Sequence, residues 1–208
     1  MTVRLVHARV AALAFALLGA AAVAAGQSLL EAAEAGNHDA ALAALKAGGD
    51  VAARGPDGTT ALIWAAYNGD AVLVAELVDA GAEVDAKNEF GASALSEAAI
   101  AGYADVIAAL LEGGADPNIT NPEGETPLMA VARTGNVAAA TLLLDAGADV
   151  NAIELWGQQS ALMWAAAQKQ PAMIRLLIAR GADVDARGAV RNWERKVIKE
   201  PRPKDMNQ

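Results

Sequence analysis

Residues 124–152 read GETPLMAVARTGNVAAATLLLDAGADVNA, and this stretch decides the fold. Pro127 opens a short apolar run, at a place where the first turn of a helix tolerates proline. Gly135 ends that run, and a second apolar run ends at Gly147, where a left-handed residue terminates a helix. The stretch therefore predicts a pair of short helices followed by an acidic turn.

The same landmarks recur along the chain at a nearly constant interval. The spacing is 33 residues, with single spacings of 34 that one extra residue at Gln158-Gln159 explains. The recurring residues are the turn glycines Gly58, Gly91, Gly124 and Gly157, the leucines Leu62, Leu95, Leu128 and Leu162, and the glycines before the acidic turn, Gly48, Gly81, Gly114, Gly147 and Gly181. A fixed period of this length is typical of proteins built from stacked repeats.

Two segments of the repeat resemble those of a known family. Glu125-Thr126-Pro127-Leu128-Met129 resembles the opening of an ankyrin repeat, and Ala146-Gly147-Ala148-Asp149-Val150-Asn151-Ala152 is similar to its ending. The resemblance covers about residues 27–187 and implies an all-α ankyrin-repeat solenoid, in which helix-turn-helix units are joined by hairpin-like turns. No repeat has the histidine that the family carries after the leucine, so we expect individual repeats to be less rigid. The expected repeats are 27–54, 55–87, 88–120, 121–153 and 154–187.

The residues of the second repeat predict the same helix pair independently. Thr60 can cap a helix over Ala61–Tyr67 with its hydroxyl group. A second helix over Val72–Ala80 places its apolar residues on one face, which only stacked neighbours can bury. The first repeat, with helices expected over Ser28–Ala35 and His38–Ala47, is interpreted as an N-terminal cap.

Residues 1–25 have the three parts of a secretory signal peptide. Arg4 and Arg9 precede an apolar run, and Ala22-Val23-Ala24 fits the small-residue rule for cleavage. The segment predicts export to the periplasm or the extracellular space of a bacterium. An uncleaved anchor, which would leave the protein attached to the membrane, and a buried first helix are the alternatives, although the apolar run is short for a membrane span.

Charge divides the chain into an acidic body and a basic end. The formal net charge is −9, but residues 26–186 hold seven Lys/Arg and 22 Asp/Glu, a net of −15. A body this acidic repels phosphate backbones, so we expect no nucleic-acid partner. Residues 188–208 are interpreted as a basic tail or a linker between repeats. Because the second helix of the fifth repeat keeps an apolar face, we expect a longer array after Gln208; the alternative is that Trp193 and its neighbours fold back as a cap.

The sequence contains little that could carry chemistry. It has no cysteine, which excludes disulfides and thiolate sites. His38 is the one histidine outside the predicted signal peptide, and we interpret it as a polar residue of an inter-helix turn. No His/Asp/Glu cluster has metal-ligand spacing, and pairs such as Asp149 and Asn151 recur in every repeat as structure. We therefore expect no enzyme activity, no cofactor and no metal.

Four apolar residues are the candidates for protein binding: Tyr67, Phe90, Ile100 and Trp156. Phe90 and Trp156 each precede a glycine at a turn tip. Tyr67 and Ile100 fall near the ends of first helices, on the side that lines the groove in ankyrin-like stacks. Aromatic residues are favoured anchors of binding surfaces. The alternative for Phe90 and Trp156 is that they fold back on neighbouring turns.

These observations predict an exported ankyrin-repeat module that binds another protein through its concave groove and turn tips. After cleavage of the signal, we expect no membrane partner. Two alternatives remain open from the sequence. The array could be a targeting arm or accessory subunit of a separate enzyme, or it could be a structural spacer.

Overall fold

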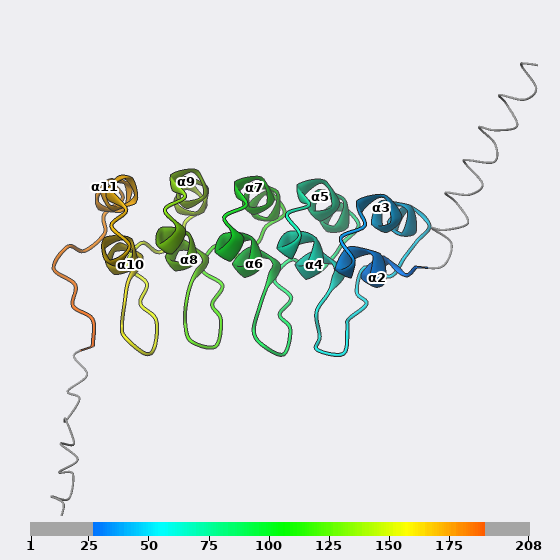
Figure 1. The fold of residues 1–208 in the computed structure, drawn as a ribbon, viewed down its shortest axis with the longest axis horizontal. Helices are drawn as coiled ribbons and strands as arrows, with labels where there is room; N and C mark the ends of the chain where they lie inside the picture. Colours follow the sequence, from blue (N-terminus) through cyan, green and yellow to red (C-terminus); the bar gives the residue numbers. More distant parts are fainter. Residues whose placement is uncertain (1–26, 190–208) are drawn as a thin grey trace, which may run out of the picture.

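The computed structural model describes residues 27–189, and within them ten helices form five consecutive pairs. Figure 1 shows two parallel rows, with one helix of each pair in each row. The inner row, beside the loops, contains α2 (Leu29–Glu34), α4 (Ala61–Tyr67), α6 (Ala94–Ala101), α8 (Pro127–Thr134) and α10 (Ala161–Ala167). The outer row contains α3 (His38–Lys46), α5 (Ala71–Asp79), α7 (Ala104–Glu112), α9 (Val137–Asp145) and α11 (Pro171–Ala179).

Hydroxyl side chains fix where the inner helices begin. Each inner helix follows a residue whose hydroxyl accepts a hydrogen bond from the amide three positions later, which satisfies one of the free N–H groups of the first turn. These capping residues are Ser28, Thr60, Ser93, Thr126 and Ser160. Ser28 therefore precedes α2 and is not part of it. In the second repeat, α4 has the predicted bounds, while α5 begins one residue earlier than predicted because Asp70 caps it.

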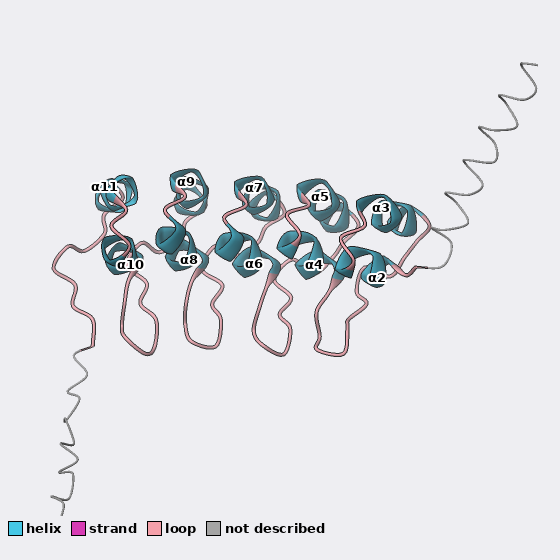
Figure 2. Cartoon of the chain, in the orientation of Figure 1, coloured by secondary structure: helices cyan, strands magenta, loops and turns pink. Residues whose placement is uncertain are grey.

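The loops that join one pair to the next project beyond the inner row as hairpin-like turns (Figure 2). Within residues 27–189 these turns contain isolated antiparallel bridges and no longer strand. Neighbouring turns are tied by backbone hydrogen bonds, from the Glu89 amide to the Asp57 carbonyl at 2.8 Å and from the Leu155 amide to the Glu123 carbonyl at 2.9 Å. The second tip is therefore tied to the third, and the fourth to the fifth.

The acidic turns have a structural role at the junctions between the last three repeats. The Asp149 carboxylate accepts a hydrogen bond from the Asn151 amide at 2.8 Å. The side chain of Asn151 then reaches the next repeat, where its oxygen accepts from the Asp183 amide at 2.8 Å and its nitrogen donates to the Gly181 carbonyl at 3.2 Å. Asn118 makes the same pair of bonds one repeat earlier. The side chains of these turns are thus hydrogen-bonded to the backbone of their own turn and of the next repeat.

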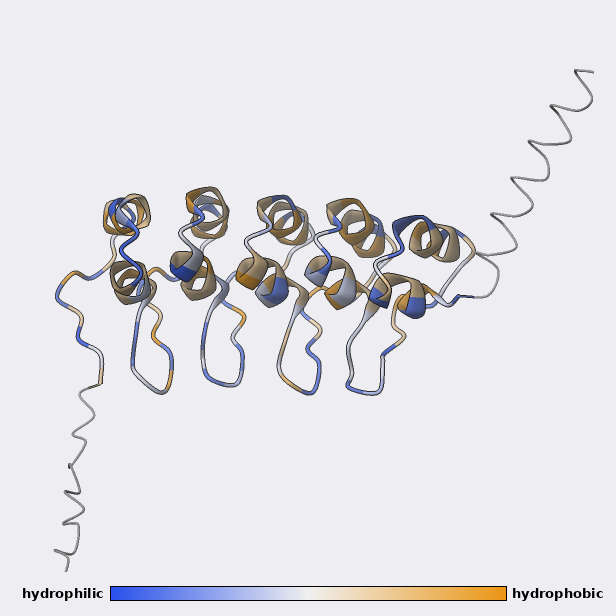
Figure 3. Ribbon diagram, viewed as in Figure 1, coloured by the Kyte–Doolittle hydropathy of each residue, from blue (hydrophilic) through white to orange (hydrophobic). Residues whose placement is uncertain are grey.

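The core lies between the two rows and between successive repeats. Leu62, Leu95 and Leu128 of the inner row are at most 1% exposed, and Leu77, Leu110, Leu143 and Leu177 of the outer row are fully buried. Burying one such side chain contributes about 1.5–3 kcal/mol. Alanines at the inner contacts let the helices approach closely, and Figure 3 shows mainly apolar colour along both rows. Because each helix pair contacts its neighbours, the stack supplies the core that no single repeat has.

The fifth repeat leaves apolar surface uncovered. Ile178 is 47% exposed, whereas Leu111 and Leu144, its equivalents in the third and fourth repeats, are half-buried. Val184 is 63% exposed, whereas Val150 at the equivalent place is half-buried. The predicted apolar face of α11 is thus present, and its Met173 and Leu177 are buried while its far side is open.

Two predicted segments lie largely or wholly outside the residues that the structure describes. The signal peptide over residues 1–25 lies outside the described residues, as does nearly all of the basic tail over residues 188–208. In the described part, no helix is both long enough and apolar enough to cross a bilayer.

Candidate protein-binding surface

Two positions of the inner helices differ in chemical type from repeat to repeat. The first is occupied, in order along the array, by Glu31, Trp64, Glu97, Ala130 and Trp164. The second is occupied by Glu34, Tyr67, Ile100, Arg133 and Ala167. In the second and third repeats the second position is open to solvent, with Tyr67 57% and Ile100 50% exposed. The inner row therefore presents a varied set of side chains on a constant frame.

Tyr67 and Ile100 line one depression. The depression crosses from α4 to α6, has a volume of about 410 Å³, and is lined by Tyr67, Asn68, Glu97, Ile100, Ala101 and Tyr103. We call it the α4–α6 depression. Trp64 packs edge-on against Tyr67, with ring centroids 5.8 Å apart, and so holds the tyrosine ring in place.

Glu97 is the one charged residue in the lining of this depression. Within residues 27–189 its side chain makes no hydrogen bond or ion pair, although it is half-buried. Burial disfavours the ionised form and raises the pKa of Glu97 above its ordinary value. The depression therefore combines exposed apolar surface with a partly desolvated negative charge.

The neighbouring repeat carries a cation that is already engaged. Arg133 Nη1 lies 3.0 Å from Glu125 Oε1, and its guanidinium carbon lies 5.6 Å from the centre of the Trp164 ring. An ion pair on one side and an aromatic face on the other fix the guanidinium between α8 and α10. Trp164, one of two tryptophans at equivalent positions, thereby packs between repeats.

The turn tips also expose large apolar side chains. Phe90 is 72% exposed and Trp156 is 65% exposed, so most of each side chain faces solvent. The sequence did not single out Ile153 and Leu155, which are 52% and 72% exposed beside Trp156. The fifth-repeat tip thus carries an apolar cluster, whereas the tip at Phe90 presents one aromatic ring.

Comparison with known proteins agrees with this architecture. The family model described as ankyrin repeats (3 copies) matches residues 29–121 and 110–188, most of the chain. The chain belongs to the ankyrin-repeat family. Ankyrin repeats are in general modules of protein–protein interaction, and the family is typically non-enzymatic. A comparison of this ankyrin array with curated proteins gave no significant match.

The fifth-repeat tip owes its shape to a residue that sequence reasoning missed. Where the earlier tips have Asn88 and Asn121, this one has Glu154, which is only 8% exposed. Its carboxylate accepts hydrogen bonds from the amides of Trp156 and Gly157, both at 2.6 Å. A third bond, from the Gln159 amide at 3.1 Å, crosses the inserted residue. The longer side chain thus spans a loop that is one residue longer, and it positions the backbone that carries Trp156.

His38 and Asp70 serve the structure of the array. The ring nitrogen Nδ1 of His38 lies 2.6 Å from Oδ2 of Asp70, which ties the first repeat to the second. The other oxygen of Asp70 caps α5. Within the described ranges, no group of three or more His, Asp or Glu side chains lies close enough together to hold a metal ion.

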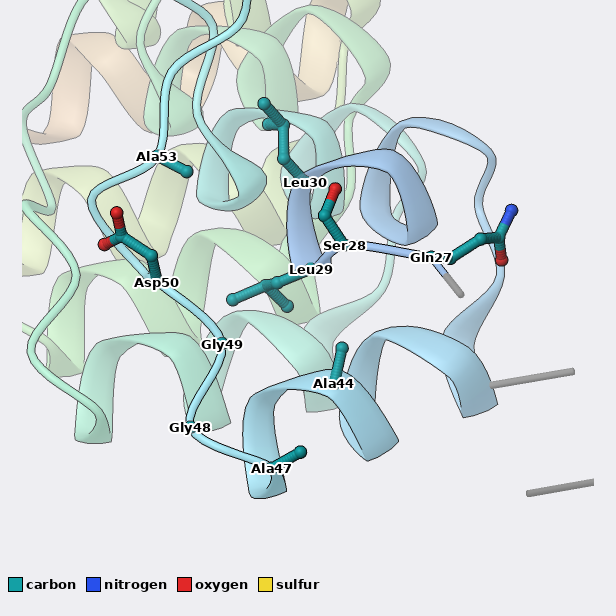
Figure 4. A pocket seen from close by; sticks show the side chains of 10 residues that line it. All are labelled: Gln27, Ser28, Leu29, Leu30, Ala44, Ala47, Gly48, Gly49, Asp50 and Ala53. Carbon is teal, nitrogen blue, oxygen red and sulfur yellow. The ribbon is translucent and has the colours of Figure 1, made fainter. Parts of the chain in front are cut away.

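A second depression lies at the N-terminal end of the array (Figure 4). It has a volume of about 330 Å³ and is lined mainly by small or aliphatic residues between Gln27 and Ala53. Asp50 is the one charged residue in its lining, and its carboxylate accepts a hydrogen bond from the Ala52 amide. With so few groups to orient a ligand, we assign the binding surface to the α4–α6 depression and the turn tips.

Proposed function

We propose that this ankyrin array binds a segment of another protein across the α4–α6 depression and along the turn tips. The observation that carries the proposal is the exposure of four large apolar side chains at the positions predicted for binding: Tyr67, Phe90, Ile100 and Trp156. Exposed aromatic residues held by rigid neighbours are favoured anchors, since little conformational entropy is lost when they bind. The stack supplies that rigidity through the Trp64 contact and the tied turns.

The experiment begins with capture of a partner by the purified chain from the producing cell, followed by direct binding measurements with that partner. Replacing Tyr67 and Ile100 together with alanine should weaken binding by at least about tenfold. Val72 offers a matched control, because it is 57% exposed but lies on α5 in the outer row. Val72→Ala should leave the affinity unchanged, and all variants should keep the parent melting temperature.

The turn tips are tested separately. Phe90→Ala combined with Trp156→Ala should abolish capture without lowering the melting temperature, because both side chains are mostly exposed. A melting temperature that falls along with binding would assign these residues to packing. A chain that captures no stoichiometric partner would favour the spacer, and a captured hydrolase would favour the accessory-subunit role.

We also propose that the array acts outside the cytoplasm. The support is the sequence of residues 1–25, in which two arginines, an apolar run and small residues follow one another. The intact mass of protein from the producing cell should correspond to a chain that begins between Ala25 and Ser28. A soluble cytosolic pool whose mass still includes Met1 or Thr2 would contradict export.

A further inference from the structure

The α4–α6 depression brings one carboxylate together with three exposed apolar or aromatic side chains. Glu97 lies in the lining with Tyr67, Ile100 and Tyr103, which are 57%, 50% and 38% exposed. A carboxylate that faces water alone is fully solvated, but this one is partly covered. The covering removes water from the carboxylate, and no hydrogen bond or ion pair within residues 27–189 replaces that water. A positive group that enters the depression therefore interacts more strongly with Glu97 than it would with a carboxylate on an open surface.

No cation of the described residues fulfils that role. Arg133, on the next inner helix, is held by Glu125 and by the ring of Trp164. Arg54 and Arg180 are paired with Glu83 and Asp145, away from the lining of the depression. The residues from 26 to 186 have a net charge of −15, so a basic partner is also attracted at longer range.

The shape around Glu97 restricts the form of the positive group. The lining combines the ring of Tyr67 with the aliphatic surface of Ile100, which suits the methylene stem of a lysine or arginine side chain. The electron-rich face of a tyrosine ring also attracts a cation. A neighbouring apolar residue of the same segment can then contact Ile100 or Tyr103, which would otherwise stay exposed to water.

We propose that the α4–α6 depression receives a lysine or arginine side chain from a protein segment, flanked by an apolar residue, with Glu97 as the counter-charge. This inference rests on the proposed protein-binding function and specifies the chemistry of the partner. Tyr67 and Ile100 supply the apolar contacts, and Glu97 selects the sign of the charge. The specificity of the third repeat thus differs from that of the fourth, where Arg133 is already held by Glu125 and the Trp164 ring.

The test uses the full purified chain and a phage-displayed library of random short peptides. Selected sequences should be enriched in lysine or arginine next to an apolar residue. A synthetic copy of the best peptide should bind Glu97→Gln at least about tenfold more weakly, the loss expected for a hydrogen bond to a charged group. Glu76→Gln is the matched control, because Glu76 is exposed on the outer helix α5, and it should bind like the parent chain.

A substitution in the peptide tests whether its basic residue pairs with Glu97. Replacing the basic residue of the peptide with glutamine should weaken binding to the parent chain but should have little further effect on Glu97→Gln, since the two groups act as a pair. In Glu97→Lys the selection should shift towards peptides with aspartate or glutamate. Melting curves of each variant verify that the fold is retained.

The outcomes separate the two proposals. Peptides that lack a cation, or carry an acid, but still lose affinity for Tyr67→Ala would overturn the inference about Glu97 and leave groove binding intact. Peptides whose affinity is unaffected by changes at Tyr67, Ile100 and Glu97 would overturn both. Failure to enrich any peptide would likewise count against both, because a groove that recognises a short segment must retain one at library concentrations.

Discussion

Replacing Gly147 isolates the contribution of backbone conformation to the stability of the array. Gly147 follows α9 with φ of +93°, and no heavy atom lies within 4 Å of the place where its Cβ would stand. A side chain here meets no neighbour, so any cost comes from forcing an L-residue into the left-handed region. That cost is roughly 1–2 kcal/mol for an ordinary residue, and a β-branched residue should cost at least as much.

Gly147→Val should therefore lower the free energy of unfolding by at least about 1–2 kcal/mol, while Gly147→Asn should lose less, because asparagine tolerates this conformation. For a chain of this size, each kcal/mol corresponds to roughly 2–4 °C in melting temperature. Urea and thermal unfolding, followed by circular dichroism, measure both changes. Equal losses for valine and asparagine would refute the backbone explanation, and an unchanged midpoint for valine would mean that Gly147 does not hold this conformation in solution.

Three further predictions concern packing and charge. Leu143→Ala should lower the free energy of unfolding by about 2–5 kcal/mol, since Leu143 is fully buried in α9; a loss below 1 kcal/mol on urea titration would contradict its place in the core. A Cβ on Gly113 would lie 2.6 Å from Cγ1 of Val78, so Gly113→Ala should destabilise the parent chain. The same substitution should cost less in a Val78→Ala background, which a double-mutant cycle of thermal unfolding measurements would show. Burial raises the pKa of Glu97 above 4.5, so the carboxyl group holds its proton more tightly in the folded state than in the unfolded state. The contribution of Glu97 to the free energy of unfolding therefore falls as pH rises from about 4.5 through the raised pKa. Glu97→Gln lacks that loss, so its stability relative to the parent should increase from acidic to neutral pH; a pH-independent difference would argue against burial as the cause.

Periodic features of this fold could be predicted from the sequence, because stacking imposes them on every repeat. The bounds of α4 and the exposure of Tyr67 and Phe90 follow from their positions within the 33-residue unit. The helix ends that were missed by one residue depend on capping side chains, as Asp70 shows for α5. A cap is a local hydrogen bond, so the apolar period alone does not locate it.

Features that depend on two repeats at once could not be predicted in the same way. The guanidinium of Arg133 lies between Glu125, in the loop before its own helix, and Trp164 of the next repeat. The raised pKa of Glu97 likewise arises from burial by its surroundings, which a residue's own position in the period does not reveal. Glu154 is a different case, because it compensates for a residue inserted in its own turn, and only the three amide contacts of its carboxylate show this.

The repeats of one chain also provide an internal comparison that separates stability from recognition. Each repeat packs against its neighbours in the same way, so a position whose side chain is buried by this packing should keep one residue type. Ala65, Ala98, Val131 and Ala165 occupy such a position, and each is small, apolar and at most 1% exposed. Two residues further along the helix, the chain instead places a tyrosine, an isoleucine, an arginine and an alanine. Stacking does not require that variety, and the exposure of Tyr67 and Ile100 shows that the packed core does not use it. Under the proposed function, the exposed positions of Tyr67 and Ile100 are therefore those at which a partner can be distinguished without loss of the fold.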